Sequence, residues 1–239
     1  MIIVRNLCKR YPSGSQVLNK MSFQVDEGDF IVIVGGSGSG KSTLLRCLSL
    51  DEKWDDGQYI YNGRDITSLN PLDKWRVKKE WAKVEEKPNL NPTLSPLKNV
   101  MTARLFQTLP WKTISKDNHM EAMDMLEQVG LLDKARMKTS QLSGGEQQRV
   151  GIARALVQGA KVLYADEPVT GLDPKSADRM LEDLRNLCRN KKATVIITLH
   201  KLELAERFAG RIWGIAGGKL AVDIPARKLT VSEKKQIFG

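Results

Sequence analysis

The sequence predicts an α/β protein built around a largely parallel β-sheet. Apolar runs at residues 30–34, 161–165 and 193–198 are rich in aliphatic side chains and are interpreted as buried strands. Stretches with the apolar spacing of helices follow the first two runs, at residues 43–48 and 178–188. Buried strands separated by helices are typical of a parallel sheet covered on both faces.

Further strands are expected at both ends of this core. Residues 2–30 are predicted to form short strands and turns, and residues 58–63 a strand with a hairpin turn. An antiparallel element therefore lies beside the parallel core. Near the end of the chain, residues 212–215 and 220–222 resemble a hairpin around Gly217 and Gly218.

The middle of the chain, roughly residues 75–150, is predicted to be a mostly helical insert. Prolines at positions 88, 92 and 96 interrupt it with loops. A helix is expected from residue 118 to Gly130, because glycine commonly ends a helix. Its apolar positions recur at helical spacing and are expected in the core: Met120, Met123, Leu126 and Val129.

Composition limits the possible classes of protein. The 239 residues suffice for one large domain or two small ones, and a hydrophobic content of 41% is ample for a core. Three separated cysteines form no metal-binding pair and predict reduced thiols. The formal charge of +10 is compatible with nucleic acid, anionic lipid or phosphorylated ligands. The densest basic patch, residues 74–79, is interpreted as a solvated helix face, with contact to a membrane surface or a partner as the alternative.

Residues 35–42 carry the pattern G-x-x-x-x-G-K-S between an apolar strand and a helix-forming run. Such a loop directs successive backbone N–H groups at one anion, and the helix that follows adds the positive end of its dipole. Lys41 supplies a cation for the phosphates of a nucleotide, and Ser42 supplies a hydroxyl for Mg²⁺. The alternative is a flexible turn rich in glycine and serine.

Two acidic residues end the predicted strand at 161–165. Ligand sites of parallel sheets gather at the carboxyl ends of strands, so Asp166 is placed to hold Mg²⁺ and Glu167 to act as general base towards a water. His200 follows the strand at 193–198, where it could contact a terminal phosphate and that water. The alternatives are an ordinary acidic turn and a structural or exposed histidine.

The stretch from Leu142 to Arg149 helps to discriminate a nucleotide-binding protein from these structural alternatives. Ser143, Gly144 and Gly145 precede a helix-forming run, which makes a second anion site at a helix N-terminus. One chain thus carries two phosphate sites. Two chains in a head-to-tail pair could each supply one of these sites to the same nucleotide.

Over essentially its whole length the sequence resembles the nucleotide-binding subunit of an ATP-binding cassette (ABC) transporter. The matching motifs occur in the family's order: an aromatic residue for adenine, the Walker A loop, the signature, the Walker B strand with its catalytic glutamate, the D-loop and the switch histidine. In this chain they are Tyr11, Gly35–Thr43, Leu142–Gln148, Val162–Glu167, Gly171–Pro174 and His200.

The resemblance implies a P-loop NTPase with ATP and Mg²⁺ as cofactors. A RecA-like parallel-sheet core with an antiparallel β subdomain would occupy about 1–83 and 156–239, and a helical signature subdomain about 84–155. The catalytic residues would be Lys41, Glu167 and His200, and the metal ligands Ser42, Glu86 and Asp166. The implied nucleotide contacts are Tyr11, Gly35, Gly36, Ser37, Gly38, Ser39, Gly40, Lys41, Ser42, Thr43, Glu86, Ser143, Gly144, Gly145 and Asp173.

The resemblance also implies partners. A second copy of the chain would sandwich two ATP molecules, with Ser143 and Gly145 of one copy facing the γ-phosphate held by the other. The sequence has no run of about 18 apolar residues. Transmembrane permease subunits, which work with a periplasmic or extracellular solute-binding protein, are therefore expected to hold the chain at the cytoplasmic face of the cell membrane. No nucleic acid partner is expected.

One position departs from the family pattern. The family has a Q-loop glutamine after a short apolar strand, and Glu86 stands there in this chain, whereas residues 89–90 and 94–100 follow the pattern. A carboxylate can still ligate Mg²⁺, but it adds negative charge near the γ-phosphate. We hypothesise altered coupling, so that Glu86→Gln should change the ATPase rate or its stimulation by the membrane partner.

Local features most resemble phosphonate or phosphite importers, namely residues 99–105, residues 198–200 and the ending at 229–239. The expected function is ATP hydrolysis that powers uptake of phosphonate, phosphite or a related oxyanion. The alternatives are an amino-acid importer, a lipoprotein or peptide exporter, and a non-transport accessory protein of phosphonate metabolism.

Overall fold

The computed structural model describes residues 1–84, 88–105 and 116–239, whose strands form two sheets. The larger sheet has the strand order β10-β9-β3-β8-β7-β6. From β9 to β6 neighbouring strands are parallel, and β10 pairs with β9 in the antiparallel sense. The predicted parallel core and terminal hairpin are therefore confirmed. The strands are β3 (Phe30–Gly35), β6 (Trp81–Val84), β7 (Val162–Ala165), β8 (Thr194–Thr198), β9 (Arg211–Ala216) and β10 (Lys219–Pro225).

The smaller sheet is antiparallel and has the order β2-β1-β4-β5, as the sequence predicts for an element beside the core. The Tyr59 hydroxyl donates to the Leu48 carbonyl oxygen at the end of α1 (3.0 Å), which anchors this sheet over that helix. The turn between β1 and β2 lies near α1 as well, because the Tyr11 hydroxyl is 3.3 Å from Thr43 Oγ1. The strands are β1 (Ile2–Arg10), β2 (Gln16–Val25), β4 (Asp56–Tyr61) and β5 (Arg64–Asp65).

Helices cover the larger sheet and its ends. They are α1 (Lys41–Leu48), α2 (Pro71–Lys78), α3 (Pro96–Leu105), α4 (Lys116–Gln128), α5 (Gly144–Val157), α6 (Pro174–Lys191), α7 (Leu202–Phe208) and α8 (Val231–Phe238), with short 3₁₀ turns η1 (Leu132–Lys134) and η2 (Thr139–Gln141). Within the described residues, no helix is both long and apolar enough to cross a membrane.

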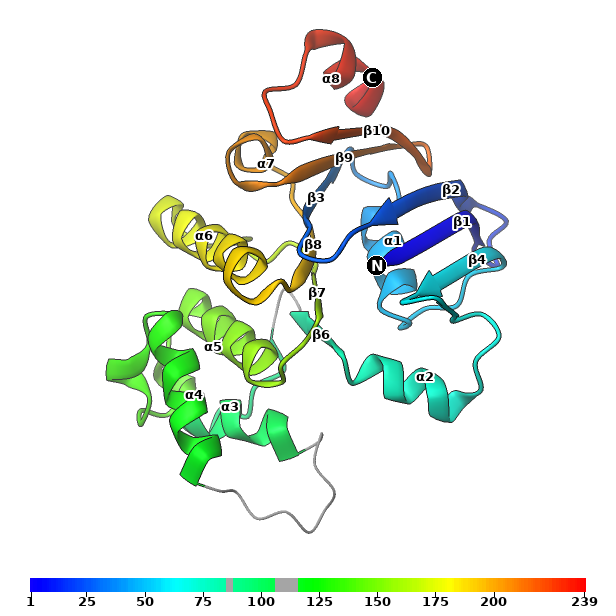
Figure 1. Cartoon of the computed structure of the whole chain (residues 1–239). Helices are drawn as coiled ribbons and strands as arrows, with labels where there is room; N and C mark the ends of the chain where they lie inside the picture. The colour runs from blue at the N-terminus through cyan, green and yellow to red at the C-terminus, as the bar shows by residue number, and fades with distance from the viewer. Residues whose placement is uncertain (85–87, 106–115) are drawn as a thin grey trace.

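Alternate residues of β3 face the two sides of the larger sheet. Phe30, Val32 and Val34 belong to a core that includes α5 and α6. Ile31 and Ile33 belong to a second core with α1 and the smaller sheet. Figure 1 shows α5 and α6 on one side of the strands, and α1 with β1, β2 and β4 on the other. A strand buried on both faces must be apolar throughout, which explains the continuous aliphatic run that predicted it.

Helices α3, α4 and α5 pack against one another beside β6 and form the predicted helical insert (Figure 1). One expectation within it is wrong, because Met120 of α4 is 62% exposed. Positions three apart drift by about 60° per step around a helix, so Met120 and Val129 cannot share one face. Leu126 is buried as predicted, as is Val129 just after the helix, and the other buried side chains of α4 are Ala122 and Met125. The subdomain boundaries near residues 84 and 155 stay a prediction.

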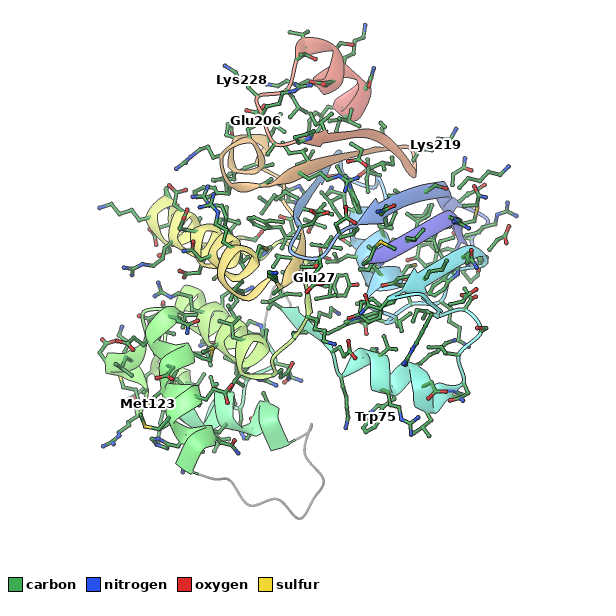
Figure 2. All side chains as sticks on the ribbon, viewed as in Figure 1. Glu27, Trp75, Met123, Glu206, Lys219 and Lys228 are labelled. Carbon is green, nitrogen blue, oxygen red and sulfur yellow. The ribbon has the colours of Figure 1, made fainter. Side chains whose placement is uncertain are left out.

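The basic patch at residues 74–79 lies on α2 and just after it, at the surface of the chain. A solvated helix face stays the prediction, with contact to a membrane surface or a partner as the alternative. Val77 is buried, whereas Trp75 is exposed. Figure 2 shows Trp75 on the outer side of α2, away from both sheets. The Lys79 ammonium lies 3.7 Å from the centroid of the Trp75 ring, so part of the ring is covered by the chain's own cation.

Candidate functional site

A tight loop joins β3 to α1 at the carboxyl edge of the larger sheet. Gly40, directly before α1, has a φ of 105°, and a Cβ there would lie 2.8 Å from a backbone oxygen of β2. A Cβ at Gly35 would lie 2.4 Å from a backbone oxygen of β9. A Cβ at Gly36 or Gly38 would meet no atom within 4 Å. The loop is thus packed against two strands at its ends and open in its middle.

Lys41 is the first residue of α1, and its ammonium group closes the loop. Nζ donates to the carbonyl oxygens of Gly35 (2.9 Å) and Gly36 (3.1 Å). Burial lowers the pKa of this ammonium, and the carboxylates of Glu167 and Asp166 act in the opposite direction. Carbonyl oxygens are weaker partners for an ammonium than phosphate oxygens are. The group therefore has the position and the chemistry to bind an anion at the loop.

The carboxylate of Asp166, directly after β7, joins α1 to the larger sheet. Its Oδ1 accepts hydrogen bonds from Ser42 Oγ (3.2 Å) and from Thr198 Oγ1 (2.6 Å). A hydroxyl and a carboxylate are oxygen ligands that suit Mg²⁺. In the described part of the chain, no three His, Cys, Asp or Glu side chains form a metal cage. A cation here would therefore take further ligands from phosphate and water, which is usual for Mg²⁺.

Glu167 and His200 form a pair at the same edge. His200 Nε2 lies 3.2 Å from Glu167 Oε1, and the glutamate side chain is 15% exposed whereas the histidine is 62% exposed. Burial raises the pKa of the Glu167 carboxyl, His200 and Lys41 oppose this, and Asp166 adds to it. A raised pKa suits a carboxylate that takes a proton from a water near neutral pH.

Thr198 is a site residue that the sequence reasoning missed. It is fully buried at the end of β8. Its hydroxyl donates to Asp166 and accepts from the backbone N–H of Glu167 (2.9 Å), so it fixes both acidic residues relative to β8. The available signal was a hydroxyl residue at the carboxyl end of a buried strand, two positions before His200.

Tyr11 lies in the turn between β1 and β2, beside α1. Its hydroxyl donates to Glu52 Oε2 (3.0 Å) and lies 3.3 Å from Thr43 Oγ1. The structure therefore brings two more of the predicted nucleotide contacts, Tyr11 and Thr43, to the helix that starts at the phosphate loop.

The predicted signature residues lie at the start of α5. Ser143 Oγ accepts from the Glu146 N–H (3.3 Å), and Glu146 Oε2 accepts from the Ser143 N–H (2.9 Å), which together form a capping box. A Cβ at Gly145 would lie 2.6 Å from Leu172 Cδ2, so this helix start packs closely against the segment before α6. Asp173 caps α6 with its own carboxylate.

The two predicted anion sites are not brought together within one chain. Helices α1 and α5 belong to cores on opposite faces of the larger sheet (Figure 1). Ser143 and Gly144 therefore lie apart from Lys41, as the prediction of a site shared between two chains requires. Glu86, predicted to be a metal ligand, lies outside the described residues.

The groups at the loop fit a nucleoside triphosphate with Mg²⁺. Ser39 Oγ is buried in the loop and has no hydrogen-bond partner within the described residues, so a polar atom there is left for a ligand. Lys41 offers a cation, Ser42 with Asp166 offers metal ligands, and Glu167 offers a base. Together these are the parts that phosphoryl transfer to water requires.

Comparisons with known proteins point to one family. A profile of the family described as ABC transporter matches residues 18–170. The phosphonates import ATP-binding protein PhnC of Lactococcus lactis subsp. cremoris is 38% identical over 100% of this chain and 98% of its own length. Phosphonates import ATP-binding protein PhnC 1 of Halalkalibacterium halodurans is 38% identical over 100% of this chain and 95% of its own length.

Two solved structures have a TM-score of 0.85, and each comparison covers 96% of this chain and 100% of the other. One is described as a dimeric bacterial ABC transporter cassette and is 30% identical. The other, 29% identical, is described as a dimeric cassette in a post-hydrolysis state with bound ADP and Pi.

Proposed function

This chain belongs to the ABC transporter family, and we propose that it is the ATP-hydrolysing subunit of an importer for phosphonate, phosphite or a related oxyanion. ATP hydrolysis is the activity of the family's cassettes. The proposed cargo is supported by full-length relatives from several bacteria that are named as phosphonate import ATP-binding proteins.

One observation supports this function more than any other: Ser42, next to Lys41, donates to Asp166 (3.2 Å) at the carboxyl edge of the parallel sheet, where Glu167 follows directly. When ATP binds, the Lys41 ammonium would exchange its two carbonyl partners for phosphate oxygens. Ser42 and Asp166 would hold Mg²⁺, which neutralises phosphate charge when bound. Thr198 would keep the Asp166 carboxylate in place, because its hydroxyl donates to Oδ1.

Proton transfer is assigned to Glu167, and His200 would position it. In this proposal the Glu167 carboxylate orients a water and takes its proton at an Oε atom as the water attacks the γ-phosphate. Burial of the carboxyl favours the protonated form that results. His200 would hold the Glu167 side chain through its Nε2 contact and also meet the terminal phosphate.

The proposed assembly is a head-to-tail dimer. Separation of α1 and α5 within one chain supports it, because the helix start at Ser143 can then complete the phosphate site of another copy. The similar cassettes of known structure are themselves described as dimeric. Permease subunits are the proposed membrane partners at the cytoplasmic face, together with a solute-binding protein outside the membrane.

The ATPase part of the proposal is tested by binding and hydrolysis measurements on the purified chain. Lys41→Ala should abolish ATP binding or hydrolysis, because no other described cation closes the loop at Gly35 and Gly36. Lys219→Ala is the matched control, since the Lys219 side chain is exposed at the start of β10 (Figure 2). Normal turnover by the Lys41→Ala chain would contradict the assigned site.

The cargo is tested in the host cell. A strain that lacks this chain should fail to grow on phosphonate or phosphite as sole phosphorus source and should still grow on phosphate. The wild-type chain should restore growth, and the Lys41→Ala chain should not. Unimpaired growth of the deletion strain on phosphonate and on phosphite would contradict this cargo.

A further inference from the structure

A network of polar side chains surrounds the hydroxyl of Tyr11. This hydroxyl donates to Glu52 Oε2 (3.0 Å), accepts from Arg46 Nη2 (3.1 Å) and lies 3.3 Å from Thr43 Oγ1. A phenol oxygen has one proton to give and two lone pairs, so its whole hydrogen-bonding capacity is in use. Such a hydroxyl holds the tyrosine ring in one position.

Glu52 connects the members of this network. Its Oε2 also accepts from Arg46 Nε (3.0 Å), and its Oε1 lies 3.5 Å from Lys9 Nζ. The Glu52 side chain is only 18% exposed, so water competes weakly for these bonds. The pKa of the carboxyl lies below its usual value, because hydrogen bonds from Arg46 and Tyr11 outweigh the opposing effect of burial. The group is therefore an anion at neutral pH and keeps its partners.

The network is attached to the helix of the phosphate loop. Arg46 Nη2 donates to Thr43 Oγ1 (3.3 Å), and these residues lie three apart on the same side of α1. Helix α1 begins at Lys41, whose ammonium closes the loop. A hydrogen-bonded path therefore runs from the Tyr11 ring to the element that positions the phosphate-binding lysine.

Tyr11 borders an open cavity beside the β1–β2 turn. This cavity of about 660 Å³ is also lined by Arg10, Pro12 and Gln16. This volume is within the range of about 300–1,000 Å³ that small-molecule sites occupy. Lys9 Nζ lies 5.5 Å from the ring centroid, and the carboxylates of Asp55 and Asp56 line the same cavity, so groups of both charges surround it.

We propose that Glu52 is a positioning residue for nucleotide binding. With Arg46 it holds the Tyr11 ring at a fixed place relative to α1, so that a base stacks on the ring while the phosphates lie in the loop. The inference rests on the proposed function, because it requires a nucleoside triphosphate at Lys41. Glu52 does not touch the phosphates, so it controls affinity for a ligand that has a base and leaves affinity for the phosphate chain unchanged.

The test compares ATP with inorganic triphosphate, which has no base. Dissociation constants for both are measured for the wild-type, Glu52→Gln, Tyr11→Phe and Asp51→Asn chains, together with single-turnover hydrolysis of bound ATP. Asp51→Asn is the matched control, because this neighbouring carboxylate pairs with Lys78 and Lys83. Glu52→Gln and Tyr11→Phe should each weaken ATP binding about three- to tenfold. Triphosphate binding should stay the same in both variants, and Asp51→Asn should leave the affinity for both ligands and the hydrolysis rate unchanged.

A double variant tests whether the two residues act together. Tyr11→Phe combined with Glu52→Gln should bind ATP no more weakly than the weaker-binding single variant, because both substitutions act on the same contact: Tyr11→Phe removes it and Glu52→Gln takes the charge from its acceptor. Equal losses for ATP and triphosphate would indicate a structural effect and overturn the proposal, as would unchanged ATP affinity in both single variants. A wild-type chain that binds neither ligand would overturn the proposed function itself, and this inference with it.

Discussion

Glu167 has a backbone conformation that L-residues other than glycine rarely adopt. Its φ is 51°, which costs about 1 kcal/mol or more for such a residue. The Thr198 hydroxyl accepts the backbone N–H of Glu167, and the Thr170 hydroxyl donates to its carboxylate (3.4 Å). These bonds help to hold the conformation and direct the carboxyl group to the edge where Lys41 and Asp166 lie.

Replacing Glu167 by glutamine tests its role as general base. Glutamine keeps the shape of the side chain but cannot take a proton, so hydrolysis should fall at least about 100-fold while ATP still binds. Because ATP is then retained, the variant should accumulate as an ATP-bound dimer, measured by phosphate release and size-exclusion chromatography. The exposed Glu203→Gln on α7 is the control. Turnover near the wild-type rate in Glu167→Gln would refute the assignment.

The pH dependence of hydrolysis gives a second test of the same carboxyl. Its pKa is raised by burial, and its deprotonated form is the active base, so activity should be lost on acidification at a higher pH than for an ordinary glutamate of pKa about 4.3. Bound phosphates add negative charge and act in the same direction. The maximal rate at saturating ATP, followed downwards from about pH 8, should therefore begin to fall at a higher pH than an ordinary glutamate would allow. Loss of activity only at the pH expected for an ordinary glutamate, or below it, would contradict the raised pKa.

At the scale of residues, the sequence predicts side chains that stand next to a recognisable strand. It misses side chains that only tertiary contacts bring to the site. Lys41, Asp166 and Glu167 were predicted because each stands at a fixed offset from an apolar strand. Thr198 and Glu52 contribute through the register of β7 with β8 and through the path of the chain after α1. No pattern within a few residues of either position records those pairings.

Helix α6 carries an unfavourable carboxylate on its half-buried side. Among the described residues, no hydrogen bond reaches the buried Oδ2 of Asp183. Burial raises the pKa of Asp183 to about 6, although Arg179 and Arg149 act to lower it. Charging this group in the folded chain therefore costs more free energy than charging it in the unfolded chain.

Asp183→Asn should raise the free energy of unfolding at neutral pH. A folded-state pKa above the unfolded one means that wild-type stability falls as pH rises from about 4 to about 6. The gain at pH 7.5 should be about 1 kcal/mol, given that solvent screens a half-buried group, and should shrink towards pH 5. Urea unfolding at the two pH values measures it. Asp178→Asn, which breaks the ion pair with Arg207, is the control and should give no such gain.

Elements differ in how well the sequence specifies them. The strands β3, β7 and β8 were predicted because burial on both faces leaves a continuous apolar run. The existence of α4 was predicted too, but its buried face was not. A spacing of three residues drifts around a helix, and contacts with α3 and α5 select Ala122 and Met125 in place of Met120.

For the molecule as a whole, the sheet that builds one phosphate site also separates it from the other. The strand order of the larger sheet places α1 and α5 on opposite faces, so a chain cannot fold its own Ser143 onto its own Lys41. Proximity of these residues requires another copy, and a two-fold axis then creates two identical sites. The sequence predicted both motifs in full. The strand order of the sheet, which the motifs do not record, determines how far apart they lie.

Mixing two inactive chains tests this arrangement. Lys41→Ala removes the loop cation, and Ser143→Arg places a bulky cation at the start of α5. In a head-to-tail dimer of one Lys41→Ala chain and one Ser143→Arg chain, one site carries both substitutions and the other carries neither. An equal mixture, half of it heterodimers, should therefore recover about a quarter of the wild-type ATPase rate if sites act independently. Each variant alone should be inactive, and heterodimers are verified by pulling down two different tags. No recovery in verified heterodimers would mean that Ser143 and Lys41 do not act across the dimer.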